Sequence, residues 1–192
     1  GQRVAISAGS RGIANIAVIL RAVVEHLKTL DAQPLIVPAM GSHGGGTAQG
    51  QRGVIESYGV TEAFVGCPIK ASMETVVVCQ TAEGFPVHFD RHAFEADHVV
   101  VMNRVKPHTR FVGDVESGLM KMMLIGLGKQ AGAEVYHRAI QDYTFGQIVR
   151  SDFRQACLDY LDHAKTWQAA WTAMRAGLPV PPSTALVAPR FP

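Results

Sequence analysis

Two histidines occupy positions where an α/β protein could carry out acid/base chemistry. His43 lies in the glycine-rich segment Gly41 to Gly46, directly after a strand-like apolar stretch, and its glycine neighbours would let a ligand approach closely. His108 follows a second strand-like stretch, with Lys106 and Arg110 close by in sequence to bind a carboxylate or phosphate. Because histidine has a pKa of about 6.5, it can transfer protons in both directions at neutral pH. For His43 alone, a solvated loop histidine explains the sequence about equally well.

Lys121 is a candidate nucleophile or site of covalent modification. Its neighbours are apolar, and such surroundings lower the pKa of an amine; they are Leu119, Met120, Met122 and Met123. The alternative is a lysine on a helix face that extends its charged end into solvent. His137 could bind a metal through one ring nitrogen, although a single histidine is a weak signal for a metal site.

The glycine-rich segments do not match the common nucleotide-binding motifs. Met123 stands where a P-loop begins with glycine, and Gln130 stands where the motif ends in Ser or Thr after Lys129. The glycines between 41 and 46 do not fit the dinucleotide-binding pattern either. They still form a glycine-rich turn before an expected helix, and helix N-termini bind anions without much specificity.

The first sixty residues alternate between strand and helix patterns. Val4 to Ala8 predicts a buried strand, and a turn at Gly9 to Gly12 follows it. One apolar face at helical spacing then predicts a helix; it comprises Ile16, Leu20, Val23, Val24 and Leu27. Pro34 to Met40 predicts a second buried strand, and a helix is expected from about Thr47 to Tyr58. This alternation favours a parallel sheet covered by helices.

The middle of the chain predicts a hairpin, a further strand and a helix. Glu74 to Gln80 and Pro86 to Asp90 are strand-like and are joined by a turn that contains Gly84. His98 to Asn103 predicts a strand, and Gly113 to Gly128 predicts a helix. Together with the first sixty residues, these elements predict an α/β fold with a Rossmann-like, mostly parallel sheet, an inserted β-hairpin and a C-terminal amphipathic helix.

The C-terminal region predicts a helix followed by a loose tail. Ser151 can cap a helix with a stripe of apolar and aromatic side chains, and Gly177 and Pro179 would end it. The stripe comprises Phe153, Cys157, Tyr160, Ala164, Trp167, Trp171 and Met174. We therefore expect a catalytic and cofactor-binding domain over residues 1–150, a helical extension over 151–178 and a proline-rich tail over 179–192.

Composition excludes several other classes of protein. The sequence is 47% hydrophobic and 18% charged, with no apolar run of about 18 residues that could span a membrane. A net charge of +2 with scattered basic residues does not favour a nucleic-acid partner. Cys67, Cys79 and Cys157 are too far apart for a CxxC pair, which favours buried thiols in a reducing cytoplasm. The chain enters its first strand directly, so we expect no signal peptide and a trimmed or partial chain.

Four segments, in their order and approximate spacing, resemble motifs of the lactate racemase family, the nickel-pincer-nucleotide enzymes. They are Met40 to Gly45, Val105 to Thr109, Ser117 to Lys121 and Tyr136 to Arg138. The resemblance extends over roughly Val4 to Arg150. Four ordered motifs are far more specific than any one of them.

The resemblance implies roles for particular residues. His43 and His108 would be the paired acid/base residues, and Arg11 would orient the substrate. Lys121 would anchor the pincer cofactor covalently, and His137 would be the protein ligand to nickel. Further cofactor contacts are expected from Gly44, Gly45 and Ser117.

The expected function is therefore a racemase or epimerase of a 2-hydroxy acid that uses proton-coupled hydride transfer and a nickel-pincer nucleotide. The first loop, Ser7 to Gly12, lacks the acidic residue and the Thr-Arg-Pro of lactate racemases, which favours a 2-hydroxy acid other than lactate. The resemblance stops after Arg150, so a second domain or a homo-oligomer partner would have to close the site. The alternative is a non-catalytic anion- or nucleotide-binding domain that docks on a partner.

Overall fold

A computed structural model describes residues 1–81, 83–104, 118–143 and 147 of the chain. Its centre is a parallel three-stranded sheet in the order β2-β1-β5, formed by Arg3–Ala8 (β1), Gln33–Pro38 (β2) and His98–Val100 (β5). The register aligns Ala8 with Pro38, so β1 and β2 end together. Ile69, which lies outside the named strands, forms an isolated parallel bridge with Ile36 of β2. The predicted parallel sheet is confirmed.

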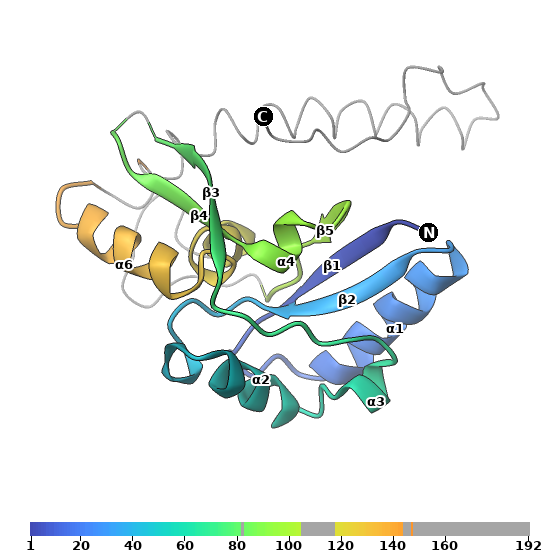
Figure 1. The fold of residues 1–192 in the computed structure, drawn as a ribbon. Coiled ribbons are helices and arrows are strands. Elements are labelled where there is room, and N and C mark those ends of the chain that lie inside the picture. The colour runs from blue at the N-terminus through green and yellow to red at the C-terminus, as the bar shows by residue number, and fades with distance from the viewer. Residues whose placement is uncertain (82, 105–117, 144–146, 148–192) are drawn as a thin grey trace, which may run out of the picture.

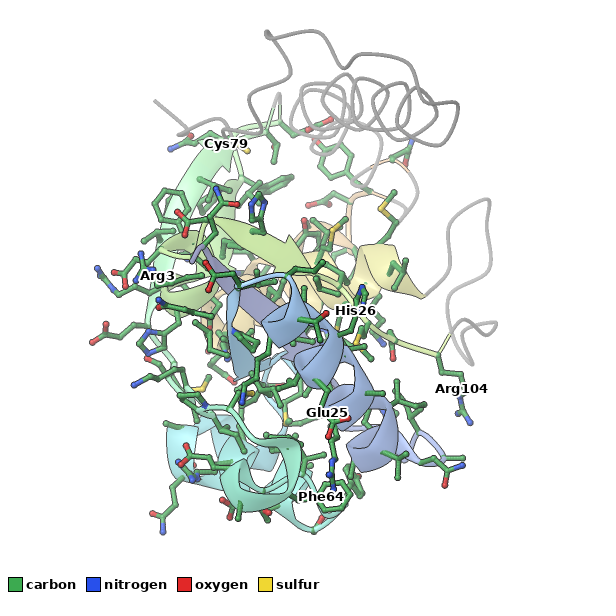
Figure 2. All side chains as sticks on the ribbon, turned by 90° about the vertical axis from the view of Figure 1, so that its right-hand side faces the viewer. Arg3, Glu25, His26, Phe64, Cys79 and Arg104 are labelled. Atoms are coloured by element: carbon green, nitrogen blue, oxygen red, sulfur yellow. The ribbon has the colours of Figure 1, made fainter. Side chains whose placement is uncertain are left out.

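Three helices cover one face of the sheet (Figure 1). They are Ile16–Thr29 (α1), Ala48–Glu56 (α2) and Glu62–Val65 (α3). Their core joins Ile6 and Ile36 of the strands to Leu20, Val24 and Ile55 of the helices, all almost completely buried. Figure 2 shows Glu25 and Phe64 where α1 meets α3; between them, Arg21 pairs with Glu25 at 2.7 Å and lies 5.4 Å from the centre of the Phe64 ring. The helix predicted from the face of Ile16 and Leu20 is confirmed.

Shorter helical segments pack on the opposite face. They are Arg91–Phe94 (α4), Leu119–Lys121 (α5), the π-helical turn Met122–Gly126 (η2) and Lys129–Ala139 (α6). Ala5 and Val37 of the sheet meet Ala93 of α4 and Met122 and Leu127 near η2 in a second core. The described residues therefore form three layers, with the sheet between two sets of helices (Figure 1).

The predicted hairpin is confirmed as Thr75–Gln80 (β3) and Pro86–Asp90 (β4), an antiparallel pair with an irregularity between Val77 and Cys79. Strand β4 leads directly into α4, whose N-cap is Asp90: its Oδ1 accepts a hydrogen bond from the Ala93 amide at 2.8 Å. The hairpin is thus tied to the central domain through a buried carboxylate. Within the described residues, no helix is long and apolar enough to cross a membrane.

Some predicted boundaries differ from the observed ones. The strand predicted to reach Asn103 ends at Val100, because the Ser7 hydroxyl takes over the next backbone groups: it accepts from the Met102 amide at 2.9 Å and donates to the Met102 carbonyl at 3.3 Å. The helix predicted over 113–128 appears, in its described part, as α5 followed by η2. Helices α3, α4 and α6 were not predicted. The predicted C-terminal helix and tail lie outside the described residues.

Candidate functional site

The candidate site lies at the carboxyl ends of β1 and β2. These strands run in parallel, and the Ala39 amide donates to the Ala8 carbonyl at 2.8 Å just beyond them. The loop with Ser10 and Arg11 and the loop with His43 therefore leave the same sheet edge side by side. Open α/β sheets bind ligands at this edge. His43 is exposed, as a group that meets a ligand must be.

The loop that carries His43 requires glycine. Gly41, Gly44, Gly45 and Gly46 all have φ between 61° and 68°, a region that other residues rarely adopt. A side chain at Gly44 would also come within 2.6 Å of the backbone of α2, in which Gly50 and Gln51 lie, so this loop and the helix are in direct contact. At Gly45 a side chain would meet nothing within 4 Å, which leaves the backbone there open to a ligand. A short 3₁₀ turn, Gly44–Gly46 (η1), ends at Thr47, which caps α2 by accepting from the Gly50 amide.

A buried polar network holds this loop from beneath. The Gln51 side-chain amide donates to the Gly41 carbonyl at 2.7 Å and, more weakly, to the His43 carbonyl at 3.4 Å. Its oxygen accepts from Lys129 Nζ at 3.3 Å. Lys129 also donates to the Pro38 carbonyl and forms an ion pair with Asp90 at 2.9 Å, and both charged side chains are fully buried. Burial lowers the pKa of Lys129, and the Asp90 carboxylate opposes this effect.

The network and two close contacts connect the His43 loop to the segment that contains Lys121. The Gly41 amide donates to the Gly126 carbonyl at 3.2 Å, and a side chain at Gly46 would come within 3.0 Å of Gln130 Oε1. Lys129 itself begins α6, shortly after η2, and has a φ of 56°. The two segments that carry His43 and Lys121 are therefore held in one arrangement.

His43 is held by a hydroxyl group, and two basic side chains influence its pKa. Its Nδ1 lies 2.5 Å from Ser10 Oγ, and the Ser10 carbonyl in turn accepts from the Tyr58 hydroxyl at 2.7 Å. Partial burial lowers the pKa of His43 below 6.5, and the positive charges of Arg11 and Lys121 lower it further. At neutral pH the imidazole is therefore uncharged and able to accept a proton. Arg11 and Lys121 are thus near enough for their charges to act on His43, and Gly44 and Gly45 follow His43 in the same loop.

Lys121 lies at the end of α5, half-buried, and η2 follows it directly. Single π-helical turns occur frequently at functional sites. His137 lies on α6 and is exposed. Among the described residues there is no group of three His, Cys, Asp or Glu side chains that could hold a metal ion.

His108 and Ser117 lie outside the described residues, as do Lys106 and Arg110. The pairing of His43 with His108 therefore remains a prediction, and so do the roles expected for all the other site residues.

The sequence interpretation missed the residues that support the site. Ser10 and Tyr58 were not selected, because neither type signals a role unless its partner is known. Gln51 sits on the expected helix without any motif, and Lys129 was considered only as part of a failed P-loop. The signal that could have found Lys129 was weak: a lysine that follows Gly128 at the end of an apolar stretch.

A comparison with protein-family models matched residues 3–145 to the lactate racemase N-terminal domain. The match covers the central sheet, both helical layers and every described residue of the candidate site. A comparison with curated proteins found no match.

Proposed function

The chain belongs to the lactate racemase N-terminal domain family, and on that basis we propose that it is the catalytic and cofactor-binding domain of a 2-hydroxy acid racemase or epimerase that uses a nickel-pincer nucleotide. The observation that carries the proposal is the environment of His43: an imidazole held by Ser10 at the carboxyl ends of β1 and β2, with a pKa lowered by burial and by the charges of Arg11 and Lys121. A 2-hydroxy acid requires a cation to bind its carboxylate and a base to accept the proton of its 2-hydroxyl group.

Arg11 provides the cation. A guanidinium can bind a carboxylate through two parallel hydrogen bonds, which fixes the orientation of the acid as well as its position. Arg11 is exposed in the loop after β1, only one residue from the Ser10 hydroxyl that holds His43. A carboxylate bound by Arg11 would therefore present its 2-hydroxyl group within the region that His43 serves.

His43 provides the base. It takes the proton of the substrate hydroxyl on one face, and His108 serves the opposite face, so that either enantiomer can lose or regain this proton. The lowered pKa supports this role, because an imidazole that is neutral before reaction can accept a proton without first losing one.

The described residues are compatible with the cofactor. Lys121 offers a half-buried amine whose charge acts on His43, and the backbone at Gly45 is open to a bulky group. In the proposed site Lys121 would hold the cofactor covalently, Gly44, Gly45 and Ser117 would contact it, and the imidazole of His137 would bind nickel. When bound, the cofactor supplies the acceptor for the hydride that leaves carbon 2 of the substrate.

The proposal can be tested on protein produced in cells that synthesise the nickel-pincer nucleotide. Mass spectrometry should find an added mass on the peptide that contains Lys121, and Lys121→Arg should abolish it. Chiral chromatography should detect interconversion of the enantiomers of at least one 2-hydroxy acid. His43→Ala should slow it by about 10² to 10⁴-fold, the usual contribution of general acid/base catalysis.

Protein that carries the cofactor but interconverts none of a broad panel of 2-hydroxy acids, even with the family's second domain added, would contradict the proposal. It would instead support a domain that binds a nucleotide without catalysis.

A further inference from the structure

Ser10 makes the closest side-chain contact with His43 among the described hydrogen bonds. Its hydroxyl oxygen lies 2.5 Å from Nδ1 of the ring, and the two residues come from different loops, one after β1 and one after β2. The contact therefore depends on the tertiary structure. It occupies one of the two ring nitrogens and leaves Nε2 as the nitrogen available to a substrate.

Tyr58 holds Ser10 in turn. Its hydroxyl donates to the Ser10 carbonyl at 2.7 Å. Tyr58 follows the C-terminal end of α2, the helix that begins directly after the His43 loop. The backbone of Ser10 is thus bonded to a residue next to the helix that supports the His43 loop. This bond holds the Ser10 hydroxyl beside the imidazole.

A hydroxyl group has a specific consequence as the partner of this imidazole. It can accept a hydrogen bond from Nδ1–H or donate one to an unprotonated Nδ1, whereas a carboxylate can only accept. A carboxylate would also stabilise the charged imidazolium and raise the pKa of the ring. Serine orients the ring without this effect, so burial and the charges of Arg11 and Lys121 still keep the pKa of His43 low.

We propose that Ser10 is the positioning residue for His43: it accepts a hydrogen bond from Nδ1–H and so directs the unprotonated Nε2 toward the substrate hydroxyl. This inference rests on the proposed function, because the direction of proton transfer follows from a 2-hydroxy acid substrate. The proton moves from the substrate oxygen to Nε2, while Nδ1 keeps its proton and its bond to Ser10. Tyr58 contributes by fixing the Ser10 backbone.

The direct test is the tautomer of His43, measured by long-range ¹H–¹⁵N NMR on the chain without cofactor, with His43→Gln to assign the signals. We expect His43 to carry its proton on Nδ1 in the wild type. Ser10→Ala should shift the population toward the Nε2–H tautomer, and Ser10→Thr, which keeps a hydroxyl, should restore the wild-type signal. Tyr58→Phe should cause a smaller shift in the same direction. Ser57→Ala, which removes a neighbouring hydroxyl bonded only to the Val54 carbonyl among the described contacts, should cause none.

Turnover gives an independent measurement. In the cofactor-loaded enzyme, Ser10→Ala should lower kcat by about 10- to 100-fold with little change in KM, as expected when a reacting group is misplaced. Combined with His43→Ala, it should have no further effect, because the residue that it positions is gone.

The outcomes separate the two proposals. Identical His43 tautomers in the wild type and in Ser10→Ala would overturn the positioning role, even in an active enzyme. If the His43 tautomer depends on Ser10 but the cofactor-loaded protein racemises no 2-hydroxy acid, the positioning contact would be supported and the proposed function overturned.

Discussion

Replacing Lys129 by Met should destabilise the protein more than any other single lysine replacement in the described residues. The side chain is fully buried, and its Nζ lies 2.9 Å from the equally buried Asp90 carboxylate. Methionine has similar length and flexibility, so the change removes the charge and the hydrogen bonds while filling most of the space. Both residues are unbranched, so the strain of the φ of 56° should change little.

The size of the effect follows from the pair that is broken. Removing one partner of a buried ion pair leaves an unpaired charge and costs about 3–5 kcal/mol. Domains are typically stable by about 5–15 kcal/mol in total, so this loss is a large fraction of the stability. The bonds to Pro38 and Gln51 are lost as well, which should also loosen the His43 loop.

The assay is equilibrium urea unfolding followed by circular dichroism, with two companion variants. Lys70→Met replaces an exposed lysine and should change the free energy of unfolding by no more than about 0.5 kcal/mol. The double variant Lys129→Met/Asp90→Asn removes both charges but keeps a side-chain oxygen to cap α4, as Asp90 does now. It should recover most of the loss.

Two results would refute this reasoning. If the free energy of unfolding of Lys129→Met lies within about 1 kcal/mol of the wild-type value, then the ion pair between Lys129 and Asp90 does not stabilise the fold as argued. If the double variant is as unstable as the single one, then the unpaired charge is not the cause of the loss.

Three further predictions concern the loop, the histidine and a buried thiol. Gly41→Ala should destabilise the protein by more than the roughly 1–2 kcal/mol that a left-handed backbone conformation costs a residue with a side chain, because its Cβ would also meet Ile125 at 3.0 Å. Gly45 has a similar φ but open space around it, so Gly45→Ala should show only the backbone cost in the same urea assay. The pKa of His43 in the folded protein lies below 6.5, so the unfolded chain binds a proton at this residue more readily. The free energy of unfolding should therefore fall as pH is lowered through 6.5 toward the folded pKa, and His43→Gln should flatten that slope. An unchanged slope in His43→Gln would contradict the lowered pKa. Burial raises the pKa of the Cys67 thiol to about 11. In the native protein at pH 8, iodoacetamide should therefore modify Cys67 more slowly than the half-buried Cys79, as measured by peptide mass spectrometry. Faster modification of Cys67 would count against its burial.

The sequence predicted the elements whose patterns are local. Helix α1 shows a clear apolar face, and β1 and β2 are continuous apolar stretches bounded by turns, so their positions could be read from spacing alone. The end of β5 could not be predicted from local spacing, because the Met102 amide bonds to the side chain of Ser7, 95 residues earlier in the sequence, instead of to a strand. Helix α6 was missed because its N-cap is Gly128, which has no side chain to cap the helix, and its first residue, Lys129, has a positive φ that the sequence does not reveal.

The candidate site shows the same division. His43 and Lys121 were selected from their residue types and neighbours and Arg11 from the family resemblance, and their roles stay predictions. Their supporting residues were not selected, because Ser10 and Gln51 gain their roles only through contacts with distant parts of the chain. Lys129 runs against the general expectation that lysines stay at the surface, and only a structure reveals the Asp90 carboxylate that makes its burial possible.

The central claim is that His43 handles only the exchangeable hydroxyl proton while the hydrogen on carbon 2 moves as hydride. The most direct measurement uses a 2-hydroxy acid deuterated at carbon 2, incubated in ordinary water with the cofactor-loaded enzyme, or with the loaded chain combined with the family's second domain. Mass spectrometry of the racemised product should find most of the deuterium retained, because a transferred hydride does not exchange with water. Loss of the deuterium to solvent at the rate of racemisation would show that a proton leaves carbon 2, and would contradict the role proposed for His43.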